Sequence, residues 1–175
     1  MFIDQRDIAM LNRILIALDN SKNPQPVFST AIAWAKINDS RLLLLNVLSN
    51  QSDHTQNNLA EWESYCVSDL EELRSLSHIV NKVGLMADIA QPLGHTGQKI
   101  CELANSWGAD LIILGQPDVM ADPENVLNDV GHYVIHHAPC PTLVVPHQCD
   151  RVFESDIDAI NEHYATQRTA ALSAV

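Results

Sequence analysis

Short apolar runs alternate along the chain with longer segments in which apolar residues recur every three or four positions. A strand buried on both faces is apolar throughout, whereas a surface helix needs only one apolar face. The expected strands are 14–18, 42–48, 85–90, 110–114 and 142–145, and the expected helices are 24–37, 59–83, 94–107 and one beginning at Asp122. This alternation predicts a single α/β domain with a parallel sheet covered by helices on both faces.

Capping and turn residues support these bounds. Asn23 and Asp122 each precede a proline, which is typical of a helix N-cap followed by proline in the first turn. Gly84 and Gly108 follow the second and third predicted helices and are expected to end them. Gly115 is expected to break the fourth strand.

The charge of the chain limits its partners. The sequence has 10 Lys and Arg against 22 Asp and Glu, a formal net charge of −12. This balance argues against nucleic acid or an anionic membrane, since both require cationic patches. Between Lys99 and Arg151 there is no Lys or Arg, so this half of the chain offers no fixed side-chain cation to a phosphate.

The chain carries no targeting signal that we recognise. No apolar run approaches the roughly 20 residues of a membrane helix, and the first twelve residues lack the apolar core of a secretory signal. We therefore expect a cytoplasmic protein. The four cysteines form no C-x-x-C pair and no metal-ligand spacing, and are interpreted as buried or incidental reduced thiols.

Histidines near the end of the last predicted helix are the remaining candidates for metal chemistry. His132 and His136 are four residues apart, opposite the apolar face of that helix, and are expected to be exposed rather than to bind metal. His137 falls on the apolar face and is expected to be packed and hydrogen-bonded. No nucleophile elbow, Walker loop or paired carboxylates follow a strand.

Four segments resemble the universal stress protein family. They are ILIALDNS at 14–21, LLNV at 44–47, GADLIILG at 108–115 and HAPCPTLVV at 137–145. ICELA at 100–104 and YVIHHAPCP at 133–141 look most similar to cyanobacterial members. The resemblance implies a Rossmann-like domain over 13–146 with strand order 3-2-1-4-5. The polar tail at 147–175 lies beyond it, with room for a short helix over 156–169.

Nucleotide-binding members of this family carry a loop of the form G-x2-G-x9-G-[S/T] after the fourth strand, whose backbone amides hold phosphate. Aligned on the HAPCP segment, the pattern here reads Gly115, Asp118, Asn128 and Asp129, so only the first glycine is retained. Gly131 lies three residues too late to replace the missing one. The resemblance thus implies a degenerate nucleotide loop.

The two acids in this loop disfavour ATP. At an effective dielectric near 20, two like charges 4 Å apart repel by about 4 kcal/mol, which corresponds to roughly three decades of affinity. A divalent ion such as Mg²⁺ would offset the repulsion by bridging carboxylate and phosphate. The sequence therefore weakens the case for ATP without excluding it.

Other parts of the family's nucleotide pocket persist. The resemblance implies that Asp19 holds the adenosine end, that Ala17 lies at the same strand end, and that the backbone of Val47 meets the base. The full set of nucleotide-site candidates is Ala17, Asp19, Val47, Leu114, Gly115, Pro117, Asp118, Asn128, Asp129 and Val130. Against a binding role, Asp19 equally suits a turn, Asp118 a solvated loop and Asp122 a plain N-cap.

Three functions follow from these observations. The first is a non-enzymatic regulatory or interaction protein in the stress response, without a cofactor, that forms a homodimer and engages a protein partner. The resemblance implies pairing through the last strand, Thr142, Leu143, Val144 and Val145. The second is a sensor that binds AMP, ATP or a cyclic dinucleotide in an altered pocket. The third is a weak ATP hydrolase, for which the sequence lacks a clear phosphate cradle.

Overall fold

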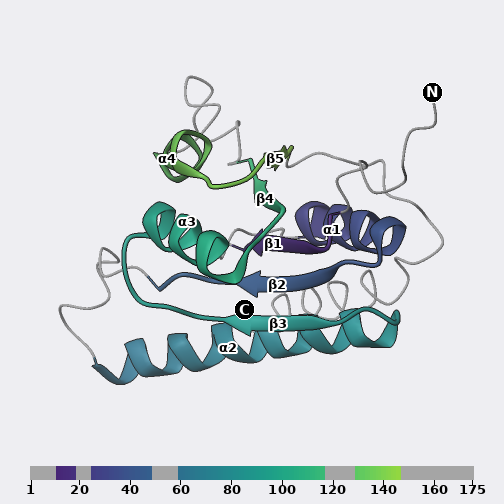
Figure 1. Cartoon of the computed structure of the whole chain (residues 1–175). Helices are drawn as coiled ribbons and strands as arrows, with labels where there is room; N and C mark the ends of the chain where they lie inside the picture. The colour runs from purple at the N-terminus through teal and green to yellow at the C-terminus, as the bar shows by residue number, and fades with distance from the viewer. Residues whose placement is uncertain (1–10, 19–24, 49–58, 117–128, 147–175) are drawn as a thin grey trace, which may run out of the picture.

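The computed structural model of the protein describes residues 11–18, 25–48, 59–116 and 129–146. Strands and helices alternate along these ranges (Figure 1). In chain order they are β1 (Arg13–Ala17), α1 (Gln25–Asn38), β2 (Arg41–Leu45), α2 (Leu59–Lys82), β3 (Ala87–Ala90), α3 (Thr96–Trp107), β4 (Leu111–Gly115), α4 (Asp129–His137) and β5 (Thr142–Val145).

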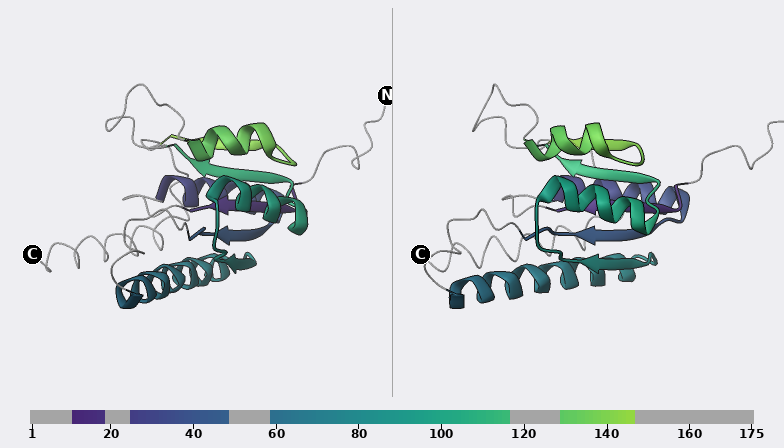
Figure 2. Two further views of the ribbon diagram at one scale, coloured as in Figure 1. Left: turned by 90° about the vertical axis from the view of Figure 1, so that its left-hand side faces the viewer. Right: turned by 60° about the vertical axis from the view of Figure 1, so that its left-hand side comes forward.

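The five strands form one parallel sheet in the order β3-β2-β1-β4-β5, which confirms the expected fold class. β1 lies in the centre, where Ile14 pairs with Leu42 of β2 on one side and with Leu111 of β4 on the other. Figure 2 shows α2 beside β3 at one end of the sheet and α4 near β5 at the other.

Each face of the sheet contributes to a separate apolar core. Ile14 and Ile16 of β1 pack with α1 and α2, whereas Leu15 packs with α3 and α4. All three side chains are fully buried. Because successive residues of a strand point to opposite faces, a strand covered on both sides must be apolar at every position. The short apolar runs of the sequence meet this requirement.

A polar cluster joins β1, α3 and β4 at the amino edge of the sheet. One Asp110 carboxylate oxygen accepts hydrogen bonds from the backbone N–H groups of Asn12 at 2.9 Å and Arg13 at 3.0 Å. The Arg13 guanidinium donates to the Trp107 carbonyl at 2.6 Å and lies over the Trp107 ring. Gly108 follows with φ 71°, so the left-handed end of α3 and the start of β4 share this anchor.

The carboxyl end of β2 is tied to α2 by a buried polar pair. Asp69 of α2 and Asn46 are each 7% exposed, and the Asn46 side-chain amide donates to the Asp69 carboxylate at 3.5 Å. Nearby, the Gln91 amide donates to the Cys66 carbonyl at 3.2 Å. Helical periodicity identified the apolar face of α2 but gave no signal that Asp69 is buried, because the partner lies on another element.

Several element bounds differ from those expected. β2 ends at Leu45 rather than at residue 48, because the chain beyond it pairs only through an isolated bridge between Leu48 and Leu93. β3 begins at Ala87 instead of 85. Gly115 does not break β4 but is its last residue, paired with Val145 of β5. The expected caps Asn23 and Asp122 and the tail at 147–175 lie outside the described residues.

Helices α3 and α4 approach closely at Gly97 (Figure 1). A Cβ atom at this position would lie 2.8 Å from Cδ1 of the Tyr133 ring and 3.0 Å from its Cβ. The Tyr133 ring is itself held by stacking on His137, with ring centroids 4.1 Å apart. Glycine at 97 is therefore required for contact between the two helices rather than for backbone conformation.

We predict that Gly97→Ala destabilises the protein by about 1–3 kcal/mol, as overpacking of a close contact does. At an unconstrained helix position the same change stabilises by up to about 1 kcal/mol, so the sign of the effect is diagnostic. Urea denaturation measures it. The neighbouring exposed Gln98→Ala is the control and should change stability by less than about 0.5 kcal/mol. An increase in stability for Gly97→Ala would contradict the packing.

Within the described residues, no helix combines the length and the apolar character needed to cross a membrane.

Candidate functional site

A cleft opens at the carboxyl edge of the sheet between β1, β4 and the amino ends of α3 and α4. It encloses about 430 Å³ of empty space, including the part open to solvent. Its lining residues come from four elements or their immediate ends: Ala17, Leu18, Thr96, Ile100, Leu114, Gly115, Val130 and Gly131.

The topology of the sheet explains why the cleft lies here. From β1 the chain crosses through α1 to β2 on one side, whereas from β4 it crosses through α4 to β5 on the other. The connections therefore diverge between the adjacent strands β1 and β4 and leave a gap above their carboxyl ends. Ala17 closes β1 opposite Leu114 of β4, so both strand ends form the floor of this gap.

Four of the ten predicted nucleotide-site residues line the cleft: Ala17, Leu114, Gly115 and Val130. Val47 and Asp129 are described but are not part of its lining, and Val47 packs against the core beneath α3 and α4. The other four, Asp19, Pro117, Asp118 and Asn128, lie outside the described residues. The role of all ten in nucleotide binding stays a prediction.

Four further lining residues were not predicted. Leu18 follows β1, and Thr96 and Ile100 lie on one face of the first turns of α3. Gly131, which the sequence alignment placed too late to serve the phosphate loop, lines the cleft from the first turn of α4. The helical period of α3 predicts that Thr96 and Ile100 lie on the same face of the helix. The sequence does not predict that this face lies beside the ends of β1 and β4.

The described walls of the cleft consist mainly of apolar side chains and glycines. Ile100 is 1% exposed and Leu114 is 5% exposed, so both belong to the core as well as to the cleft. Thr96 supplies the lining's one side-chain hydroxyl among the described residues, and none of these lining side chains is ionisable. Such a surface suits a flat apolar ring held by van der Waals contact and backbone hydrogen bonds, and it supplies no acid, base or nucleophile.

The histidines of this half of the domain lie on α4 and just before α3. His95 precedes α3, and its ring centroid is 6.3 Å from that of Tyr133. His137 is exposed, and its Nδ1 is 2.8 Å from the Tyr133 carbonyl oxygen. The expected hydrogen bond of His137 is present, but its expected place on the buried face is wrong. His132 and His136 are exposed as expected, and the described residues contain no cluster of potential metal ligands.

Three cysteines are free and partly buried: Cys66, Cys101 and Cys140. Burial raises the pKa of each thiol, and the carboxylates of Asp69 and Asp110 add to the effect at Cys66 and Cys140 respectively. A raised pKa lowers the thiolate fraction at neutral pH, and the thiolate is the reactive form. These thiols are therefore poor nucleophiles.

The fold and the cleft define a class of protein: a parallel α/β domain with a cleft at its topological switch point. A model of the family described as "Universal stress protein family" matches residues 10–146, and the chain belongs to this family.

Individual relatives agree with this assignment. A universal stress protein of Synechocystis sp. is 26% identical over 160 residues, which covers 77% of this chain and 97% of that protein. The solved structure of universal stress protein UspA from Lactobacillus plantarum superposes with a TM-score of 0.68 at 22% identity, covering 78% of this chain and 99% of that one. A universal stress protein solved in complex with cAMP gives 0.59 at 16% identity, covering 79% and 98%.

We predict that Cys101 and Cys140 react with iodoacetamide more slowly than a free thiol such as N-acetylcysteine at pH 7. Their alkylation should accelerate as pH rises toward the raised pKa values, because more thiolate forms. Mass spectrometry of tryptic peptides reads each site separately. The protein in urea is the control, in which both sites should react at the rate of the free thiol. Equal rates in the folded protein at pH 7 would contradict the burial of these thiols.

Proposed function

We propose that this protein is a non-enzymatic regulatory module of the stress response that senses an adenine mononucleotide in the cleft between β1 and β4. The observation that carries this proposal is the composition of the cleft: apolar walls, glycines and one hydroxyl, without an ionisable lining residue among those described. Walls of this kind are suited to holding a ring by contact, and the described lining residues supply no group for catalysis.

Two further observations favour an adenine nucleotide as the ligand. Ala17, Leu114 and Gly115, for which the family resemblance implies contact with a nucleotide, line the cleft. A universal stress protein with the same fold has been solved in complex with cAMP. The acids that replace loop residues at 118 and 129 weigh against a triphosphate, so the proposal specifies a mononucleotide. Its proposed place of action is the cytoplasm.

Saturating AMP or cAMP should stabilise the protein. A ligand present at 100 times its dissociation constant adds about 2.7 kcal/mol to the free energy of unfolding. Thermal melting with adenosine, AMP, cAMP and ATP, each with and without Mg²⁺, measures the effect. Asp19→Asn should abolish the shift by removing the charge proposed to hold the ribose. The absence of any shift at millimolar concentrations would refute the sensing function.

We further propose that the module is a homodimer joined through the edge strand β5. The Ile112 and Gln116 N–H groups donate to the carbonyls of Pro141 and Val145. In a parallel ladder this pattern directs the N–H and C=O groups of Thr142 and Val144 away from β4. They are therefore oriented to pair with the same strand of a second copy.

Val144→Pro should convert the dimer into a folded monomer, because proline removes an outward N–H that a partner strand would need but leaves the hydrogen bonds to β4. Sedimentation velocity measures the mass, and circular dichroism confirms the fold. Val144→Ala, which keeps the N–H, is the matched control and should remain dimeric. A wild-type protein that is monomeric at tens of micromolar would refute this proposal.

A further inference from the structure

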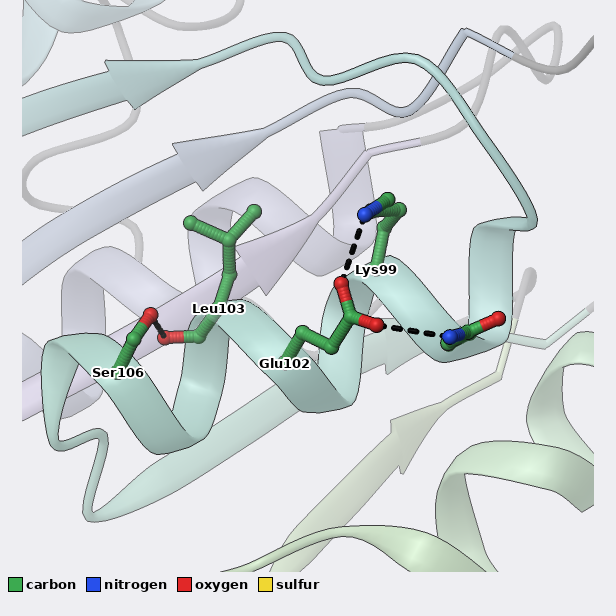
Figure 3. Close-up of polar contacts among 5 residues, drawn as sticks. Lys99, Glu102, Leu103 and Ser106 are labelled. Carbon is green, nitrogen blue, oxygen red and sulfur yellow. Dashed lines mark hydrogen bonds and ion pairs between the residues drawn. The ribbon is translucent and has the colours of Figure 1, made fainter.

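The outward face of α1 carries large apolar side chains. Trp34 is 43% exposed and Ile37 is 74% exposed, and residues three apart are neighbours on a helix surface. The outward face of α3 is different, because there the Lys99 Nζ lies 2.7 Å from the Glu102 carboxylate, which also accepts a hydrogen bond from the Gln98 amide at 2.8 Å (Figure 3). Such polar pairs suit a helix face in water, whereas adjacent exposed apolar residues are typical of a contact surface.

Trp34 lies on the flank of α1 that faces β5. Val27 shows the orientation of this flank, since a Cβ atom added to Gly115 at the end of β4 would lie 3.0 Å from the Val27 Cγ2 atom. Gly115 in turn pairs with Val145 of β5. Trp34 follows Val27 by seven residues, close to two helical turns, and therefore lies on the same flank. Because α1 returns toward the amino edge of the sheet, Trp34 is about 10 Å closer to that edge than Val27 and is level with the first half of β5.

The face of β5 on this side of the sheet is incompletely covered. Leu143 and Val145 point to the core that α1 and α2 share, but Leu143 is only partly buried. α4 packs beside β5 on the opposite face (Figure 1), and α1 reaches β5 only from above β1 and β4. Among the described residues, no further helix lies beyond α1 on its own face. Since a parallel strand is normally covered on both faces, one more helix beside Trp34 would complete the cover of β5.

The chain that follows β5 has the sequence of such a helix. Its large apolar residues recur at intervals of four, three and four, which predicts one apolar helical face: Phe153, Ile157, Ile160 and Tyr164. Acids recur every four residues on the opposite side of the same helical projection: Glu154, Asp158 and Glu162. Ser155 precedes Asp158 by three residues, which is the spacing of a capping box and supports the helix expected over 156–169.

We propose that residues 156–169 return as a fifth helix of the same domain and pack their apolar stripe on Trp34 and Leu143. The Gln116 N–H donates to the Val145 carbonyl, so the chain leaves β5 at the carboxyl edge. Residues 147–155 extend up to about 30 Å, which is ample for the connection. A helix over 156–169 is about 21 Å long and spans the roughly 13 Å of β5.

This inference extends the folding unit beyond residue 146, where the match to the family model ends. It assigns an intramolecular partner to the exposed flank of α1 and leaves the acidic side of the new helix in water. It does not depend on the ligand proposed for the cleft or on pairing through the edge of β5. Its failure would therefore leave the proposed function unaffected.

Photo-cross-linking of the full-length protein tests which segment covers Trp34. With p-benzoylphenylalanine in place of Trp34, irradiation should yield cross-links within one chain to peptides that contain residues 153–164, as read by mass spectrometry. The same probe in place of Val67, which is 55% exposed on α2 beside β3 at the other end of the sheet, is the matched control and should not reach these peptides. Cross-links that join two chains would assign the face to a second copy and overturn the inference, as would the absence of cross-links from position 34 to the tail.

Hydrogen exchange tests whether the contact stabilises the helix. In the wild-type protein the amides of 156–169 should exchange at least tenfold more slowly than in an unstructured peptide. Trp34→Ser and Ile160→Ser should each return them to near the unstructured rate, whereas Glu162→Ser, on the opposite side of the predicted helix, and Val67→Ser should not. Unchanged protection of β1 and β4 shows that each variant is folded. Tail amides that are unprotected in wild type, or still protected in Trp34→Ser, would contradict the proposed packing.

Discussion

The burial of β1 on both faces is the constraint on which the rest of the structure depends. Ile14, Leu15 and Ile16 are fully excluded from water, and they point alternately into two different cores. A parallel sheet of this kind is stable only when helices cover both of its faces. In this protein α1 and α2 cover one face, and α3 and α4 cover the other.

The two edges of the sheet then acquire different roles. At the amino edge, Asp110 and Arg13 join β1, α3 and β4 through hydrogen bonds and a ring contact, and four of the described basic residues gather there or at nearby helix ends. At the carboxyl edge, the diverging crossovers leave a cleft with apolar walls. The amino edge therefore carries contacts that join these elements, whereas the carboxyl edge carries the cleft.

The distribution of charge bears on the ligand proposed for that edge. The chain is strongly acidic, and the segment from 100 to 150 contains acids but no Lys or Arg. A ligand with several negative charges would meet repulsion from these acids, whereas a ring with at most one phosphate would meet less repulsion and would contact the apolar walls of the cleft.

The sequence by itself determined the class of fold and the order of its elements. The apolar run at 14–18 reflects the burial of both faces of a strand. Gly84 and Gly108 follow helices and adopt the left-handed backbone conformation that glycine favours. Both features can therefore be predicted from residues that are neighbours in the sequence. The tertiary structure alone decided which residues meet. The buried Asp69 beside Asn46, the contact of Gly97 with Tyr133, and the place of Thr96 and Gly131 in the cleft all join residues at least twenty positions apart. Such contacts depend on which elements become neighbours across the sheet. The apolar periodicity of a helix shows which of its faces is buried, but it does not show which element that face contacts.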